Sequence, residues 1–130
     1  MYNIGIIGAG KVGVSLGRYL LGLDYTNLVG YYSRSLYSSA YAAKVTNSGK
    51  FTSIEKLVEK SNVILITTPD DQISEIWSTI SKFSIQNKIV CHCSGSLSSE
   101  IFFDISSKGA SGCSMHPILA ISSKENSYKD

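Results

Sequence analysis

Short apolar runs alternate with amphipathic segments along most of this chain. Four runs are rich in branched and aromatic apolar residues and are bounded by turn residues: 2–7, 27–32, 63–67 and 88–92. Such runs are typical of strands buried inside a parallel sheet. Two weaker runs predict a brief strand at 50–52 and another strand at 110–115.

Between these runs, apolar residues recur every three or four positions, as on one face of a helix. The spacing predicts helices over 12–23, 36–45, 53–58, 73–83 and 101–105. Strands alternating with helices of this length indicate βαβ units, whose right-handed crossovers build one parallel sheet. The sequence therefore predicts an α/β domain with a doubly wound parallel sheet.

The first predicted strand runs into a glycine turn, Gly8-Ala9-Gly10-Lys11-Val12-Gly13, which a helix follows. In a dinucleotide site Gly8 allows the tight turn, Gly10 lets the backbone approach a pyrophosphate, and Gly13 lets the helix pack against the strand. The helix N-terminus then offers N–H groups to the phosphates. A P-loop is disfavoured, because Lys11 does not stand in the GxxxxGK pattern. The alternative is a glycine turn that only packs.

The nucleotide type is indicated by the end of the second predicted strand. NAD sites usually place an acidic residue about 20 positions after the glycines, to hold the ribose hydroxyls. Here that position holds Ser33-Arg34-Ser35, and no Asp or Glu occurs between Asp24 and Glu55. A guanidinium flanked by hydroxyls suits a 2′-phosphate, so NADP(H) is preferred over NAD(H). The alternative for Arg34 is a solvated loop charge.

Other strand ends supply further candidates, because ligands of open α/β sheets bind there. The residues that follow the later strands are Thr67, Thr68 and Pro69, then Ser94 and Gly95, then His116. His116 could exchange a proton with a substrate carbonyl or hydroxyl, or only hydrogen-bond at a strand end. The neighbouring pair Asp70 and Asp71 is interpreted as a helix start rather than an acid–base pair.

Five residues suggest a zinc site, but their spacing disfavours it. The residues that suggest it are Cys91, His92, Cys93, Cys113 and His116. A C-x-C spacing on a buried strand fits a zinc knuckle poorly, and strand alternation places His92 on the face opposite Cys91 and Cys93. We expect no metal and three free thiols in a reducing cytosol.

Composition excludes several classes of protein. The chain has 130 residues, 43% hydrophobic and 17% charged, and a net charge of +2. So small a positive excess argues against nucleic-acid binding. No apolar run approaches the roughly 18–20 residues that span a bilayer. The strand-like start leads us to expect no signal peptide and a cytoplasmic location.

Several motifs together resemble a two-domain Rossmann-like family related to deazaflavin-dependent NADP reductases and pyrroline-5-carboxylate reductases. The motifs are the glycine stretch 4–13, Tyr32-Ser33-Arg34-Ser35, Thr68-Pro69-Asp70-Asp71, His92-Cys93-Ser94-Gly95-Ser96 and Met115-His116-Pro117. Prephenate dehydrogenases carry a similar His-Pro step. The resemblance covers residues 2–117.

The resemblance implies an NADP(H)-binding oxidoreductase domain over 1–117. The glycine turn would contact the pyrophosphate, Ser33, Arg34 and Ser35 the 2′-phosphate, and His116 would lie near a small-molecule substrate. Thr68, Pro69, Ser94 and Gly95 would line the cofactor groove. Relatives continue into a helical domain that forms a homodimer, and residues 118–130 would lead towards such a domain.

The leading hypothesis is hydride transfer between the nicotinamide and a small carbonyl or imine. One alternative is a non-catalytic nucleotide-binding or sensing module. Another is binding of a nucleotide sugar or an adenylate at the same turn.

Overall fold

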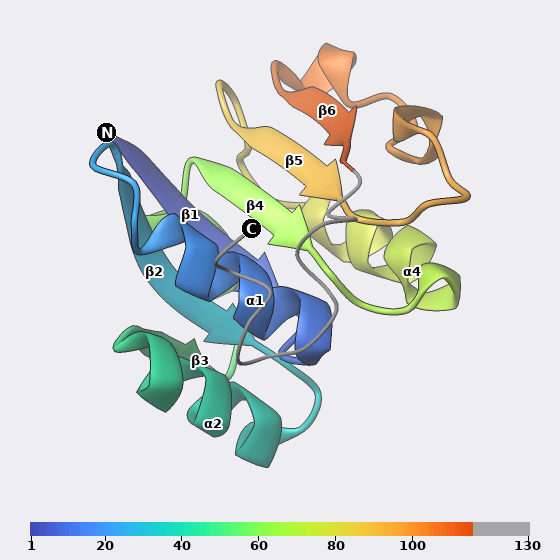
Figure 1. Ribbon diagram of the computed structural model, residues 1–130. Helices are drawn as coiled ribbons and strands as arrows, with labels where there is room; N and C mark the ends of the chain where they lie inside the picture. Colours follow the sequence, from blue (N-terminus) through green and yellow to red (C-terminus); the bar gives the residue numbers. More distant parts are fainter. Residues whose placement is uncertain (116–130) are drawn as a thin grey trace.

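The strands form one fully parallel sheet in the computed structural model, which describes residues 1–115 (Figure 1). They are β1 (Tyr2–Ile7), β2 (Thr26–Tyr32), β3 (Gly49–Phe51), β4 (Val63–Ile66), β5 (Ile89–His92) and β6 (Ser111–Ser114). Their order across the sheet is β3-β2-β1-β4-β5-β6. The direction of winding reverses between β1 and β4, so the predicted doubly wound α/β fold is confirmed.

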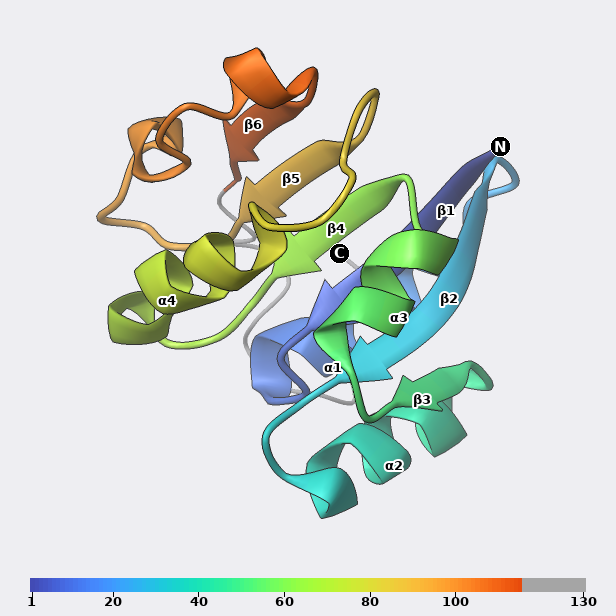
Figure 2. The same cartoon turned by 180° about the vertical axis from the view of Figure 1, so that it is seen from behind.

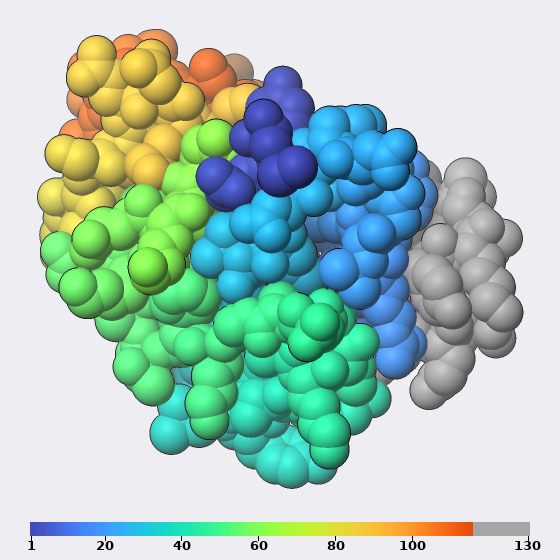
Figure 3. Space-filling model, turned by 90° about the vertical axis from the view of Figure 1, so that its left-hand side faces the viewer, coloured from blue at the N-terminus to red at the C-terminus, as the bar shows by residue number. Residues whose placement is uncertain are grey.

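Helices cover both faces of this sheet. They are α1 (Lys11–Leu20), α2 (Leu36–Thr46), α3 (Ile54–Lys60) and α4 (Asp70–Ile80), with short 3-10 helices η1 (Ser99–Ile101) and η2 (Ser106–Lys108). Helices α1 and α2 lie on one face, and α3 and α4 lie on the other (Figures 1 and 2). The segments from α2 to α3, coloured teal to green, gather at the β3 edge of the molecule (Figure 3).

Side-chain alternation along the strands divides the core into two layers. Ile4 and Ile6 of β1 pack with Val14 of α1 on one face, whereas Ile7 packs with the α3 and α4 side chains on the other, Leu57 among them. Successive residues of a strand point to opposite faces, so one strand supplies both layers. The sheet is thereby buried on both sides, as its apolar runs predicted.

Local signals set most helix starts. Ser35 caps α2 and Ser53 caps α3, each accepting a backbone N–H with its hydroxyl oxygen. Asp70 and Asp71 stand in the first turn of α4, where acidic side chains interact favourably with the helix dipole. The interpretation of this pair as a helix start is confirmed.

The helix predicted over 101–105 is wrong. This stretch passes from η1 to η2, and Asp104 adopts a left-handed conformation (φ 66°) that a right-handed helix does not allow. Phe102 is buried against Trp77, and the Trp77 indole donates a hydrogen bond to the Phe103 carbonyl (3.2 Å). The apolar spacing therefore reflects packing of an irregular segment on α4.

Candidate functional site

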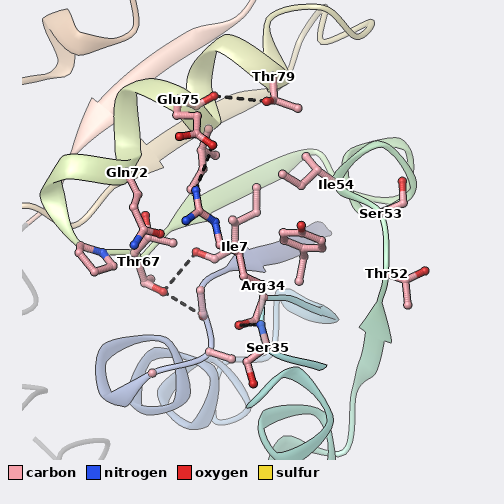
Figure 4. Close-up of a pocket in the computed structure, with 18 of the residues that line it drawn as sticks. Ile7, Arg34, Ser35, Thr52, Ser53, Ile54, Thr67, Gln72, Glu75 and Thr79 are labelled. Carbon is pink, nitrogen blue, oxygen red and sulfur yellow. Dashed lines mark hydrogen bonds and ion pairs between the residues drawn. The ribbon is translucent and has the colours of Figure 1, made fainter. Parts of the chain in front are cut away.

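A pocket of about 660 Å³ opens at the carboxyl ends of β1, β2, β3 and β4 (Figure 4). It is lined by Ile7, Gly8, Ala9, Gly10, Tyr32, Ser33, Arg34, Ser35, Thr52, Ser53, Ile54, Glu55, Thr67, Thr68, Pro69, Gln72, Glu75, Ile76, Thr79 and Phe83. The sheet edge thus brings the glycine turn, the Ser33–Ser35 segment and the Thr67–Pro69 segment to one cavity, as the parallel topology predicts.

The glycine turn has the backbone that its sequence predicted. Gly8 has φ 117°, which side chains rarely allow, and a Cβ there would meet the Thr67 hydroxyl. A Cβ on Gly13 would collide with the carbonyl oxygen of Gly8. The predicted steric roles of both glycines are therefore confirmed, because α1 packs directly against the turn.

Gly10 differs from its two neighbours in the motif. A Cβ on Gly10 would meet no protein atom within 4 Å, and the residue lines the pocket. Gly10 is also the N-cap of α1, which has no side-chain cap and no acidic residue in its first turn. The first N–H groups of α1, including those of Lys11 and Val12, therefore lack a side-chain partner and suit an anion.

Thr67 and Thr68 have different roles in the turn after β4. The Thr67 hydroxyl donates to the Gly8 carbonyl (3.0 Å), and so ties this turn to the glycine turn. The Thr68 Oγ1 is buried and is the one such side-chain atom in residues 1–115 that lacks a hydrogen-bond partner. Thr68 lines the pocket, so a polar ligand group there would satisfy this hydroxyl.

Ser33, Arg34 and Ser35 lie together at the end of β2. The Ser33 hydroxyl oxygen accepts from the Ser35 N–H (3.2 Å), and the Ser35 hydroxyl oxygen accepts from the Ser38 N–H (3.2 Å). Each hydroxyl can still donate its own proton to a ligand. The Arg34 guanidinium is exposed and pairs with Glu75 across the pocket, with Nη2 and Oε1 3.0 Å apart (Figure 4).

Sequence reasoning missed one wall of the pocket. The missed residues come from the segment that leads into α3, from α4 and from the turn that follows α4: Thr52, Ser53, Ile54, Glu55, Gln72, Glu75, Ile76, Thr79 and Phe83. The periodic pattern assigned Ile76 and Phe83 to a core face, and it had no signal for Glu75 or Gln72. Only the docking of α4 beside the end of β2 brings Gln72 and Glu75 to the site.

Ser94 and Gly95 lie outside this pocket, and their contact with a cofactor stays a prediction. Ser94 is buried, and its hydroxyl oxygen accepts from the backbone N–H groups of Ser96 and Leu97, both at 3.1 Å. Ser96 in turn donates to Asp70 at the start of α4 (2.8 Å). This network holds the loop after β5 against α4.

His92 has a structural role in the same loop. Its buried ring accepts the Ser94 N–H at Nδ1 (3.1 Å), and its Nε2 lies 2.8 Å from the Ser98 carbonyl oxygen. Because Nδ1 is an acceptor, the proton belongs on Nε2, which donates to that carbonyl. His116 and Pro117 lie outside the described residues.

The cysteines correct one expectation. Cys91 and Cys113 stand opposite each other on β5 and β6, with Cα atoms 4.5 Å apart, and form a disulfide. The prediction of free thiols at these two positions is wrong, because the register of β5 against β6 is not visible in the sequence. Cys93 is free, and burial raises the pKa of its thiol to about 11.

Two features are absent from residues 1–115. No group of three or more His, Cys, Asp or Glu side chains could hold a metal ion. No helix in this part of the chain is both long and apolar enough to span a bilayer.

Comparison with known proteins agrees with this geometry. A Rossmann-like domain family matches residues 1–117. The chain belongs to this Rossmann-like domain family. No curated protein matches the sequence.

Solved structures resemble this Rossmann-like domain over most of its length. A candidate NADPH-dependent oxidoreductase from Desulfitobacterium hafniense has TM-score 0.76 and 19% identity, and the match covers 90% of this chain and 35% of that one. Mycobacterium tuberculosis 3-hydroxyisobutyrate dehydrogenase has TM-score 0.74 and 16% identity, and the match covers 89% of this chain and 40% of that one. GenD2 from gentamicin A biosynthesis, in complex with NAD, has TM-score 0.73 and 12% identity, and the match covers 92% of this chain and 35% of that one. These likenesses establish the fold, and the chain spans two fifths or less of each structure.

Proposed function

We propose that this Rossmann-like domain binds NADP(H) for an oxidoreductase. The observation that carries the proposal is the single pocket that joins the glycine turn to Arg34. A dinucleotide with a 2′-phosphate needs an anion site at a helix N-terminus and a cationic site at the end of the second strand. In this chain Gly10, at the N-terminus of α1, and Arg34, after β2, line the same cavity, which supports the proposal.

The residues fit the two phosphate groups in different ways. The pyrophosphate would lie at the N-terminus of α1, where Gly10 leaves open space, and Thr68 carries an unpartnered buried hydroxyl close to the turn. The 2′-phosphate would accept hydrogen bonds from Arg34, Ser33 and Ser35. Charge-assisted hydrogen bonds from a guanidinium are the strong ones in such a site.

The proposed chemistry is hydride transfer to or from a small carbonyl or imine substrate. The nicotinamide would supply or accept the hydride, and the protein would position it. Solved structures with this fold include a candidate NADPH-dependent oxidoreductase and a 3-hydroxyisobutyrate dehydrogenase, which motivates the reaction class. His116 is proposed to exchange a proton with the substrate.

Nucleotide titration tests the binding step. We expect NADPH to bind at least about tenfold more tightly than NADH, and Arg34→Ala to remove most of that difference, since one guanidinium–phosphate pair is worth about 1.4 kcal/mol or more. The measurement is calorimetric or fluorescence titration of the purified chain with each nucleotide.

Lys44→Ala is the matched control, because it removes a positive charge at the far end of α2, outside the pocket. Equal affinity for NADPH and NADH would contradict the role of Arg34. Tight binding without turnover of any carbonyl or imine would favour the alternative, a nucleotide-binding or sensing module.

A further inference from the structure

Arg34, the cation proposed to bind the 2′-phosphate, is already paired with a carboxylate. Arg34 Nη2 and Glu75 Oε1 are 3.0 Å apart, and both residues line the pocket. Arg34 follows β2, whereas Glu75 lies on α4, so their side chains meet across the cavity (Figure 4). A phosphate that binds Arg34 in this position therefore approaches Glu75 as well.

This ion pair is weak enough for a ligand to displace. The side chains of Arg34 and Glu75 are 60% and 72% exposed. Exposed pairs of this kind contribute little to stability, because water screens the charges and holding two long side chains costs entropy. A phosphate dianion makes stronger, bidentate hydrogen bonds with a guanidinium than this single contact.

The backbone of Glu75 is held beside the pocket by its helix. It stands on α4, which is anchored by the buried side chains of Ile73, Ile76 and Trp77. When a ligand takes Arg34, the Glu75 carboxylate stays within side-chain reach of the bound group. Like charges this close repel, and the cost falls on a 2′-phosphate but not on a 2′-hydroxyl.

The other charges of the pocket do not compensate for this carboxylate. Among the residues that line the cavity, Arg34 is the one cation, and Glu55 and Glu75 are both acidic. The two carboxylates offset part of the attraction between Arg34 and a 2′-phosphate, so the site favours NADP(H) over NAD(H) less strongly than a site with the cation alone.

We propose that Glu75 is a specificity-determining residue that competes with the 2′-phosphate for Arg34 and thereby limits the preference for NADP(H) over NAD(H). The inference rests on the proposed nucleotide binding and adds a residue that the glycine and Arg34 motifs do not contain. It assigns cofactor preference to a contact between two segments that are far apart in sequence.

Glu75→Gln tests this inference. The variant keeps the size of the side chain and removes its charge, so we expect NADPH to bind about fivefold more tightly, as loss of a repulsion of roughly 1 kcal/mol implies. NADH affinity should change by less than about twofold, because its ribose carries no phosphate. In the Arg34→Ala background, Glu75→Gln should tighten NADPH binding by less than in the wild-type background, since no guanidinium remains to be released and only the repulsion between carboxylate and phosphate is relieved.

Glu59→Gln is the matched control. Glu59 is also exposed and paired with a cation, Lys56 at 3.8 Å, but it lies outside the pocket. It should leave both nucleotide affinities unchanged. Unaltered circular dichroism and melting temperature would confirm that each variant folds.

Two failures are distinguishable. If wild-type protein binds NADPH but Glu75→Gln leaves the NADPH-to-NADH ratio unchanged, or lowers it, the role of Glu75 is overturned while the nucleotide site stands. If neither wild type nor variant binds either nucleotide, the proposed function is overturned, and the inference with it.

Discussion

Thr67 shapes the candidate site without standing free for a ligand. Its hydroxyl donates to the Gly8 carbonyl, and the space beside it leaves no room for a Cβ on Gly8 or Gly13. Thr67 therefore links the turn after β4 to the glycine turn after β1. Thr68, one position later, keeps the buried hydroxyl that a bound polar group could satisfy.

Cys93 should react slowly with alkylating reagents at neutral pH. Burial raises the pKa of its thiol to about 11, so only roughly one molecule in a thousand carries the thiolate at pH 8. We expect the rate of iodoacetamide labelling, measured by mass spectrometry without reductant, to rise about tenfold per pH unit from pH 8 to pH 10. Cys93→Ser should abolish the label. A rate that levels off near pH 9 would contradict the raised pKa.

At the scale of elements, the buried side chain of Tyr31 links β2 to α1 by a hydrogen bond. Tyr31 of β2 is fully buried, and its hydroxyl donates to the Gly13 carbonyl (2.9 Å). Burial is the main reason that the pKa of Tyr31 is raised, because the phenolate would lose its hydration. The contact joins the strand that leads to Arg34 to the helix that follows the glycine turn.

Tyr31→Phe should lower the free energy of unfolding by about 1 kcal/mol at pH 8, since it removes the hydrogen bond that the buried Tyr31 hydroxyl donates to the Gly13 carbonyl. The difference should shrink at high pH. An unfolded tyrosine ionises near pH 10 and the buried one does not, so wild-type stability falls as the pH rises above 10, and the variant lacks this loss.

Urea unfolding of wild type and Tyr31→Phe at pH 8 and pH 11 measures both effects. Tyr37→Phe is the control, because Tyr37 is exposed on α2. A stability difference that is constant across this pH range would contradict the raised pKa of Tyr31.

At the scale of the whole molecule, the sheet order decides what meets at the site. Because β1 lies between β2 and β4, the ends of these three strands meet in one place. The same order places β6 at the edge, tied to β5 by the Cys91–Cys113 disulfide. Disulfides persist in oxidising surroundings, so whether Cys91 and Cys113 are bonded depends on the redox conditions of the compartment in which the chain folds.

Thiol counting tests this bond. We expect one reactive thiol, Cys93, in protein that is unfolded without reductant, and all three cysteines to react after reduction. Reduction should lower the free energy of unfolding by about 3 kcal/mol, as expected for a loop of roughly 20 residues. Cys113→Ser should show the same loss without reductant. Three reactive thiols in unreduced protein would contradict the pairing.

Local physics explains what could be predicted. Strand and helix positions follow from side-chain periods of two and about 3.6 residues, which are properties of a chain segment. The helix starts at Ser35 and Ser53, and the turn at Gly8, follow from single residues and their neighbours. The prediction of a helix over 101–105 failed because the apolar spacing there reflects packing on α4 rather than helix formation.

The sequence by itself therefore determined the doubly wound fold, the glycine turn and the place of Arg34 at the end of β2. Only the tertiary structure decided that Glu75 faces Arg34, that Thr67 clamps Gly8, and that Cys91 pairs with Cys113. Each of these contacts joins segments that are distant in the chain. Their geometry depends on how strands align and on how helices dock, and both are decided by contacts between segments rather than within one segment.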